Sequence, residues 1–336
     1  MKLGNVTLII LSILVFATLT IYPSTGVYAN NSGKYVYITS VSNNTLSIVD
    51  PSTSKIVMSL RVGVWPVGIA IDPDSRRAYI VNEGDGDVHI IDLESNSFIG
   101  KIKVGTGPMH ITLNPGAKRA FVTNTDDKDQ TVSVIDLTKN VELKKIKVGK
   151  EPFHISVDPT GKRAFVSNSG DNSVSVIDTG NNSVIGTIRV GNVPLGTAFN
   201  PSNGRVYVAN HDEGSLSVID SKNNKVTGTI KVGERPWYIG VDPGNNRLYV
   251  TNKGSDTVSV IDTEKNEVVS TINVGAQPLG IAVDVDNERV YVVNHKDLSM
   301  TVIDTNTNRV NNTVNLSLTD RDSSYVGAPW GVEVFK

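Results

Sequence analysis

Cysteine is missing from the whole sequence, which excludes disulfides, thiolate metal sites and thiol nucleophiles. A basic stripe is missing as well, because 32 Lys and Arg residues are interspersed with 34 Asp and Glu residues, for a net charge of −2. This balance argues against nucleic acid, and against an anionic membrane surface, as partners. Apolar residues at helical spacing are also absent from the regular part of the chain, so its core is not expected to be helical.

The first 29 residues have a composition of their own. Lys2 precedes an apolar stretch from Val6 to Tyr22, and Val27-Tyr28-Ala29 offers a small-residue cleavage site. We therefore predict a signal peptide over 1–29, which is either cleaved or retained as a membrane anchor, and one globular domain over 30–336. The protein is expected to be exported and to lie in the periplasm, at the cell surface or outside the cell.

One unit of about 42 residues repeats seven times in the remaining chain. Each unit has an alternating strand that ends in Ile-Asp or Val-Asp, and a second anchor, Val-Gly, recurs at the same spacing. The aspartates are 42 residues apart, except for 44 residues between the second and the third, and they are Asp50, Asp92, Asp136, Asp178, Asp220, Asp262 and Asp304. Periods of this length are typical of solenoids, propellers and repeat arrays.

The content of one unit separates these architectures. Residues 234–275 hold four short runs rich in Val, Ile, Tyr and Thr, and the runs are separated by turns built from Gly, Pro, Asn and Asp. Within them, Thr257–Ile261 alternates polar and apolar residues with the period of a β-strand. Four hairpin-connected strands per unit describe a propeller blade. The sequence thus predicts an all-β, seven-bladed β-propeller with four antiparallel strands per blade.

The two ends of the repeat region complement each other. The first unit begins with Tyr35–Thr39, which corresponds to the second strand of the other units, and Pro329–Val334 corresponds to the missing first strand. We expect the C-terminal strand to join the first blade and close the ring non-covalently.

A four-residue motif marks the second strand of the units. It stands as Tyr-Val-Thr-Asn at 249–252, with close variants at 121–124, 165–168, 207–210 and 291–294, while the first unit departs and ends in Ser40. The chain resembles the YVTN-family β-propeller repeat proteins of archaeal and bacterial cell surfaces and periplasms. The resemblance covers about 300 residues. It implies the fold but no single function, because family members range from surface-layer-like proteins to ligand binders and related propellers include enzymes.

Residues shared by all units are expected to be structural. The aspartates at the strand ends suit side-chain hydrogen bonds to the following turn. A proline starts each innermost strand, where no ladder donor is required. Because a site needs one arrangement rather than seven equal ones, functional residues should lie where the units differ.

The units differ most on the face that holds the loops into the innermost strands and the loops after the YVTN-type strands, which we call the top face. Three residues replace the usual glycine two positions after a proline, two histidines follow the YVTN-type asparagine, and two tryptophans flank prolines at the channel mouth. These predicted ligand-binding residues are His110, His154, Tyr238, His211, His295, Trp237 and Trp330.

Four of the five histidines in the chain belong to this set. Neutral imidazole suits copper and zinc, so His110, His154, His211 and His295 are a candidate metal site. A metal ion there would activate water or polarise a carbonyl, and a histidine pair would serve as general acid and base. His89 replaces a strand serine and is interpreted as an ordinary polar position. The cofactor is otherwise unknown: covalent heme is disfavoured because C-x-x-C-H is absent, and a non-covalent cofactor stays open.

Two insertions also fall in predicted top loops, one around Leu318–Ser323 and one over Asp126–Gln130. Loop elaboration is typical of binding faces, although drift at tolerant loop tips explains it equally well.

Three functions are compatible with these patterns. The favoured hypothesis is an exported or cell-surface module that binds a ligand or protein through its top face. The alternatives are a metal-dependent enzyme similar to propeller lyases, lactonases or oxidoreductases, and a structural component of a surface layer. Cell-surface proteins or glycans are the expected partners, and the chain is expected to be a monomer.

Overall fold

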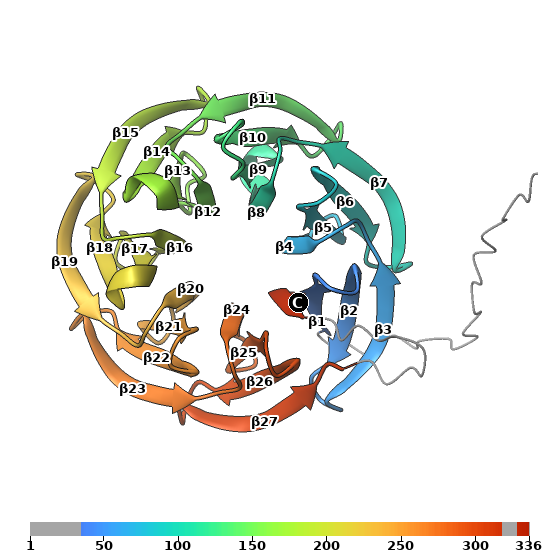
Figure 1. Cartoon of the computed structure of the whole chain (residues 1–336), viewed down its shortest axis with the longest axis vertical. Helices are drawn as coiled ribbons and strands as arrows, with labels where there is room; N and C mark the ends of the chain where they lie inside the picture. Colours follow the sequence, from blue (N-terminus) through green and yellow to red (C-terminus); the bar gives the residue numbers. More distant parts are fainter. Residues whose placement is uncertain (1–34, 318–327, 336) are drawn as a thin grey trace, which may run out of the picture. The chain divides into compact units, whose positions relative to one another are not determined.

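The computed structural model describes residues 35–317 and 328–335. The predicted signal peptide and the insertion at Leu318–Ser323 lie outside these residues. In the described part, 28 strands form seven four-stranded antiparallel sheets, arranged as blades around a common axis (Figure 1). The prediction of an all-β seven-bladed propeller is confirmed.

Each blade runs from an innermost to an outermost strand. Blade 1 contains β28 (Pro329–Phe335), β1 (Tyr35–Ser40), β2 (Thr45–Asp50) and β3 (Lys55–Arg61). Blade 2 contains β4 (Pro66–Asp72), β5 (Arg77–Asn82), β6 (Asp87–Asp92) and β7 (Ser97–Lys103). Blade 3 contains β8 (Pro108–Asn114), β9 (Arg119–Asn124), β10 (Thr131–Asp136) and β11 (Val141–Lys147). Blade 4 contains β12 (Pro152–Val157), β13 (Arg163–Asn168), β14 (Ser173–Asp178) and β15 (Ser183–Arg189).

Blade 5 contains β16 (Pro194–Asn200), β17 (Arg205–Asn210), β18 (Ser215–Asp220) and β19 (Lys225–Lys231). Blade 6 contains β20 (Pro236–Asp242), β21 (Arg247–Asn252), β22 (Thr257–Asp262) and β23 (Glu267–Asn273). Blade 7 contains β24 (Pro278–Asp284), β25 (Arg289–Asn294), β26 (Ser299–Asp304) and β27 (Arg309–Asn315). Single-turn 3₁₀ helices follow three strands as η1 (Pro115–Ala117), η2 (Ser169–Asp171) and η3 (His211–Glu213). None of the helices in the described ranges has the length and hydropathy needed to cross a membrane.

The C-terminal strand closes the ring as predicted. β28 pairs antiparallel with β1, with Val36 opposite Val334 and Ile38 opposite Val332. All four side chains are buried and belong to one core cluster with residues of blade 7. The first and last parts of the repeat region therefore share one sheet.

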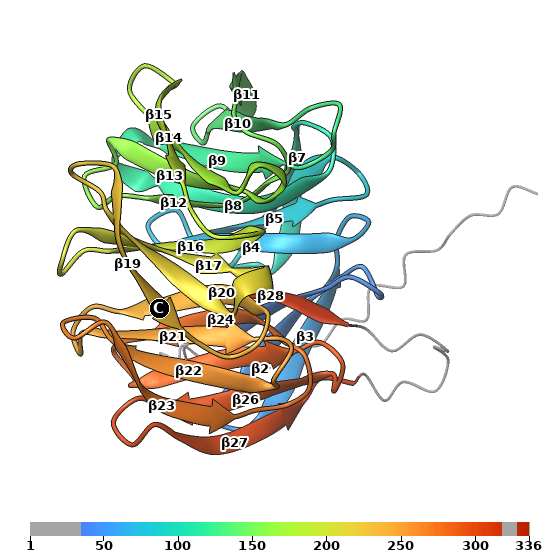
Figure 2. The same ribbon diagram turned by 60° about the vertical axis from the view of Figure 1, so that its left-hand side comes forward.

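The core lies between neighbouring blades. Tyr249 and Val258 of blade 6 pack with Val290 and Ile303 of blade 7, and all four are fully buried. Innermost strands of successive blades also contact each other, as β16, β20 and β24 do in both ribbon views (Figure 2). Because burying a Val or Ile side chain is worth roughly 1.5–3 kcal/mol, each blade depends on its neighbours for its stability.

The two sequence anchors meet in space. Asn252, the last residue of the YVTN motif, donates its amide to the hydroxyls of Thr257 (3.0 Å) and Ser259 (2.9 Å). A Cβ on Gly233 of the preceding Val-Gly would lie 2.6 Å from the Asn252 carboxamide carbon. The glycine is thus required because the motif asparagine packs against it.

The threonine of the motif joins blades. Thr251 Oγ1 accepts the Tyr238 N–H (3.0 Å) and donates to the Leu279 carbonyl of the next blade (2.8 Å). The same bridge is formed by Thr39, Thr123 and Ser167.

The strand-end aspartates are structural, as expected. Asp262 Oδ1 accepts the backbone N–H of Glu264 (3.0 Å) and of Lys265 (3.1 Å). The other six aspartates accept from the same turn positions.

Candidate functional site

The innermost strands begin with a local irregularity that sets the direction of the predicted site residues. In β20 the register shifts between Pro236 and Ile239, so Trp237 and Tyr238 lie in a β-bulge. Similar shifts occur at the start of β4, β8, β12, β16 and β24. Bulges re-aim side chains. Here they place the second residue after the proline on the wall of an axial cavity.

Glycine occupies this bulge position in β4, β16, β24 and β28. A Cβ on Gly280 would lie 2.4 Å from the Trp330 carbonyl oxygen, and one on Gly331 would lie 2.3 Å from the Val67 carbonyl oxygen. Only glycine permits such close backbone approach. At the same position in β8, β12 and β20, the ring accommodates the side chains of His110, His154 and Tyr238.

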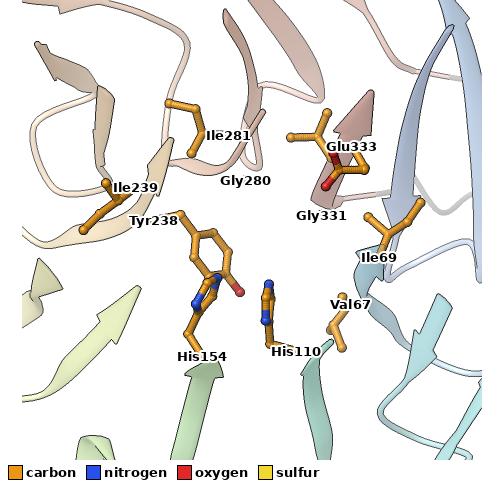
Figure 3. Close-up of a pocket in the computed structure, with 12 residues that line it drawn as sticks. Val67, Ile69, His110, His154, Tyr238, Ile239, Gly280, Ile281, Gly331 and Glu333 are labelled. Atoms are coloured by element: carbon orange, nitrogen blue, oxygen red, sulfur yellow. The ribbon is translucent and has the colours of Figure 1, made fainter. Parts of the chain in front are cut away.

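His110 and His154 form a stacked pair. Their ring centroids are 3.6 Å apart and the ring planes are inclined by 28°. Tyr238 lies beside the pair, with its ring centroid 5.0 Å from that of His154 and 6.1 Å from that of His110. The three side chains converge in the close-up view (Figure 3). Two neighbouring blades thus supply the imidazoles, and a third blade supplies the phenol.

Both imidazoles are neutral at pH 7. Burial lowers the pKa of His110 to about 3. Burial, together with the adjacent His110, also holds the pKa of His154 well below its usual range. The Thr197 N–H donates to His154 Nδ1 (3.3 Å). The neutral His154 ring therefore carries its proton on Nε2 and is a donor there.

Two tryptophans connect the remaining predicted residues to this pair. The rings of Trp237 and Trp330 meet edge to face, with centroids 5.9 Å apart. His211 contacts Trp237 at 5.6 Å, and His295 contacts Trp330 at 5.8 Å. The ring centroid of Phe153 lies 5.7 Å from that of Trp237 and 6.1 Å from that of Tyr238, so Phe153 connects the tryptophans with the stacked pair and Tyr238. We call the seven predicted residues together with Phe153 the aromatic cluster, since ring contacts connect all eight.

One basic residue of this region was not among the predicted site residues. Lys253 Nζ lies 4.3 Å from the centroid of the Trp237 ring, a cation–π distance. Burial and the nearby Arg235 lower its pKa. The signal for it was available, because Lys253 follows the motif asparagine just as His211 and His295 do.

A cavity of about 170 Å³ opens on the axis beside the stacked pair (Figure 3). Six of the seven innermost strands contribute to its wall, and its lining residues are Val67, Gly68, Ile69, His110, His154, Tyr238, Ile239, Gly280, Ile281, Gly331, Val332 and Glu333. Burial raises the pKa of the Tyr238 hydroxyl, and hydrogen bonding from the nearby indole N–H groups of Trp330 and Trp237 lowers it. Both indole nitrogens are buried, and neither donates a well-formed hydrogen bond within the protein.

The four top-face histidines do not gather around one point. Two of them stack, and the other two pack against separate tryptophans. Within the described ranges, the one set of three ligating side chains whose donor atoms lie within 4.8 Å of each other is Asp85, Asp87 and His89. A metal ion at the top-face histidines stays a prediction.

Comparison with known proteins places the chain in a family. A family model described as the cytochrome D1 heme domain matches residues 24–320. The chain belongs to the cytochrome D1 heme domain family. No curated protein matches this member by sequence.

Solved structures similar to this family member share its fold. Hydrazine synthase of Kuenenia stuttgartiensis is 21% identical, with a TM-score of 0.73 over 80% of this chain and 92% of that one. A functionally unknown protein from Desulfotomaculum acetoxidans is 14% identical, with a TM-score of 0.77 over 90% and 98%. Dihydro-heme d1 dehydrogenase NirN, in complex with DHE, is 14% identical, with a TM-score of 0.67 over 94% and 78%.

The family name implies a heme, and the axial cavity does not fit one. Its volume of about 170 Å³ lies below the roughly 300–1,000 Å³ of pockets for drug-sized ligands, and a tetrapyrrole is larger than most of these. The twelve lining residues include Glu333 but neither Lys nor Arg to pair with tetrapyrrole carboxylates. We assign no step to heme in this cavity.

Proposed function

We propose that this chain is an exported or cell-surface propeller that binds a small ligand on its axis, through the top face. The observation that carries the proposal is the aromatic cluster. Seven residues that interrupt a regular repeat, scattered from position 110 to position 330, are joined through Phe153 by ring contacts, and three of them line one cavity. A purely structural ring does not require the side chains of His110, His154 and Tyr238, since glycine serves at their position in the four other blades.

The size and chemistry of the site favour a small ligand that offers hydrogen-bond acceptors. The indole N–H groups of Trp237 and Trp330 make only weak contacts with the Tyr238 hydroxyl, and His154 presents an Nε2–H. Lys253 adds a positive charge above Trp237. Buried donors without partners typically cost about 1–3 kcal/mol each, and a ligand that supplies acceptors removes this cost.

Tryptophan fluorescence provides a direct test. Trp65 is 53% exposed and lies outside the cluster, so a Trp65→Phe variant keeps only the two tryptophans of the site as reporters. We expect a saturable fluorescence change with small acceptor ligands such as acetate or formate. Tyr238→Phe and His154→Ala in the same background should each abolish it, whereas His89→Ser should leave it unchanged.

A protein-binding role of the same face is tested by capture of cell-surface proteins and glycans with the same variants. The proposal is wrong if Tyr238→Phe and His154→Ala leave every binding activity of the protein as it is in the wild type.

A further inference from the structure

A second group of potential ligands lies in blade 2, outside the axial cavity. Asp85 precedes β6, and Asp87 and His89 are its first and third residues, so the latter two share one face of the strand. Their donor atoms lie within 4.8 Å of one another. Asp85 is exposed, His89 is partly buried and Asp87 is only 2% exposed.

These residues replace a pair of hydroxyls that the other blades use. The position of Asp87 holds Thr45, Thr131, Ser173, Ser215, Thr257 and Ser299 in the other blades, and that of His89 holds Ser47, Ser133, Ser175, Ser217, Ser259 and Thr301. Asp87 still accepts the Asn82 amide at 3.0 Å, as the hydroxyls do for their own asparagines. The fold therefore needs only a hydroxyl here, and the carboxylate and imidazole go beyond that need.

The local electrostatics leave the two side chains weakly compensated. Lys101 Nζ lies 3.3 Å from Asp87 Oδ2, but its side chain is 64% exposed, and pairs of this kind are worth at most about 1 kcal/mol. His89 Nε2 lies 3.6 Å from Asp87 Oδ1. His89 Nδ1 is buried without a hydrogen-bond partner in the protein.

Asp85 is held in place by the loop that connects β3 of blade 1 with β4 of blade 2. Its Oδ2 accepts the backbone N–H of Val64 at 2.8 Å, and Lys103 donates to its carbonyl oxygen. A carboxylate has further lone pairs, so Asp85 can bind an ion without losing this hydrogen bond. The blade thus presents one fixed carboxylate at the surface above one buried carboxylate and one imidazole.

We propose that Asp85, Asp87 and His89 form a site for a divalent transition-metal ion, with zinc as the ion that fits this set. One imidazole nitrogen and two carboxylate oxygens are zinc ligands, at about 2.0–2.2 Å. Calcium and magnesium prefer oxygen ligands alone. The donor atoms lie within 4.8 Å of one another, so the side chains must rotate to close on an ion, and the exposed side of Asp85 leaves a fourth position for water.

Lys101 competes with the ion in this arrangement. It is paired across the strands with His89, at a position where four other blades have threonine, namely Thr187, Thr229, Thr271 and Thr313. Removal of its charge should therefore strengthen metal binding without disturbing the sheet.

Titration calorimetry with zinc chloride on the chelator-treated mature protein tests the site. We expect one zinc ion per chain at this site, at least about tenfold weaker binding in His89→Ser, and loss of this binding in Asp87→Ser/His89→Ser. Both variants restore side chains of sister blades, so they should fold, as circular dichroism and melting will check. Lys101→Thr should bind zinc more tightly than the wild type.

Two controls separate this site from others. His211→Ser removes a histidine that is 17% exposed and lies 2.6 Å from a carboxylate oxygen of Asp212, and His110→Ala/His154→Ala removes the stacked pair. Neither should change zinc binding in blade 2, and cobalt should give visible absorption bands that disappear only without His89. Equal zinc uptake by the wild type and Asp87→Ser/His89→Ser, or none by the wild type, would overturn the proposal.

Discussion

At the scale of single residues, the stacked imidazoles depend on both being neutral. His110 and His154 approach to 3.6 Å between ring centroids, and protonation of either ring would bury a charge against the other. No such charge arises at pH 7, because burial holds both pKa values low. The pair is therefore a source of acid sensitivity in a chain without disulfides.

This sensitivity has a defined direction. The unfolded chain takes up protons on its histidines as the pH falls below about 6.5, whereas folded His110, with a pKa of about 3, does not. Stability is thus retained above pH 6.5 and lost below it, by about 2 kcal/mol for His110 between pH 7 and pH 5. Urea unfolding at the two pH values should show a smaller loss in His110→Asn than in wild type. A loss in His110→Asn equal to that of the wild type would contradict this account.

At the scale of structural elements, the repeat specified the strands closely. The sequence predicted a strand at Thr257–Ile261, and β22 runs from Thr257 to Asp262. The strand is evident because polar and apolar residues alternate. The bulge after each proline was not predictable, since it depends on contact between innermost strands of different blades. The unlike residues at 110, 154 and 238 were visible, but the stack and the cavity beside it arise only when distant blades meet.

The Asp85–Asp87–His89 group was missed for a related reason. His89 replaces a strand serine and was interpreted as an ordinary polar residue. Its signal was the paired replacement, with Asp87 two positions earlier on the same strand face. The two replacements stand out together only against the equivalent strands of the other blades, which carry two hydroxyls there.

The threonine bridge between blades gives a prediction for one element. Thr251→Val should destabilise the protein by about 1 kcal/mol, because it removes the hydrogen bond to the Leu279 carbonyl and leaves the Tyr238 N–H without its acceptor. Blade 7 carries Val293 at the equivalent position, so valine is compatible with the strand. Urea unfolding of Thr251→Val and of the reverse change, Val293→Thr, measures the effect. Equal stability of wild type and Thr251→Val would show that the bridge contributes nothing.

At the scale of the whole molecule, the ring depends on β28. Removal of residues 329–336 would leave the apolar β1 as an unpaired edge strand and expose part of the core that contains Val36 and Ile38. We expect the shortened chain to aggregate or to elute as an expanded species in size-exclusion chromatography. A synthetic peptide of residues 329–336 should restore the compact form, and a shortened chain that is compact and equally stable alone would contradict the role of β28.

The shared sheet also bears on how the protein folds. Thr39 and Gly331 are hydrogen-bonded across 292 positions of sequence, whereas the other sheets form from neighbouring hairpins. Closing so long a loop costs conformational entropy before the contacts between β1 and β28 can offset that cost. Pairing of these two strands is therefore expected to be the last and slowest step of folding. Until then the nascent protein is an open arc of blades in which β1 is an unpaired edge strand. The time spent in that state sets its exposure to proteases and to other unfinished chains.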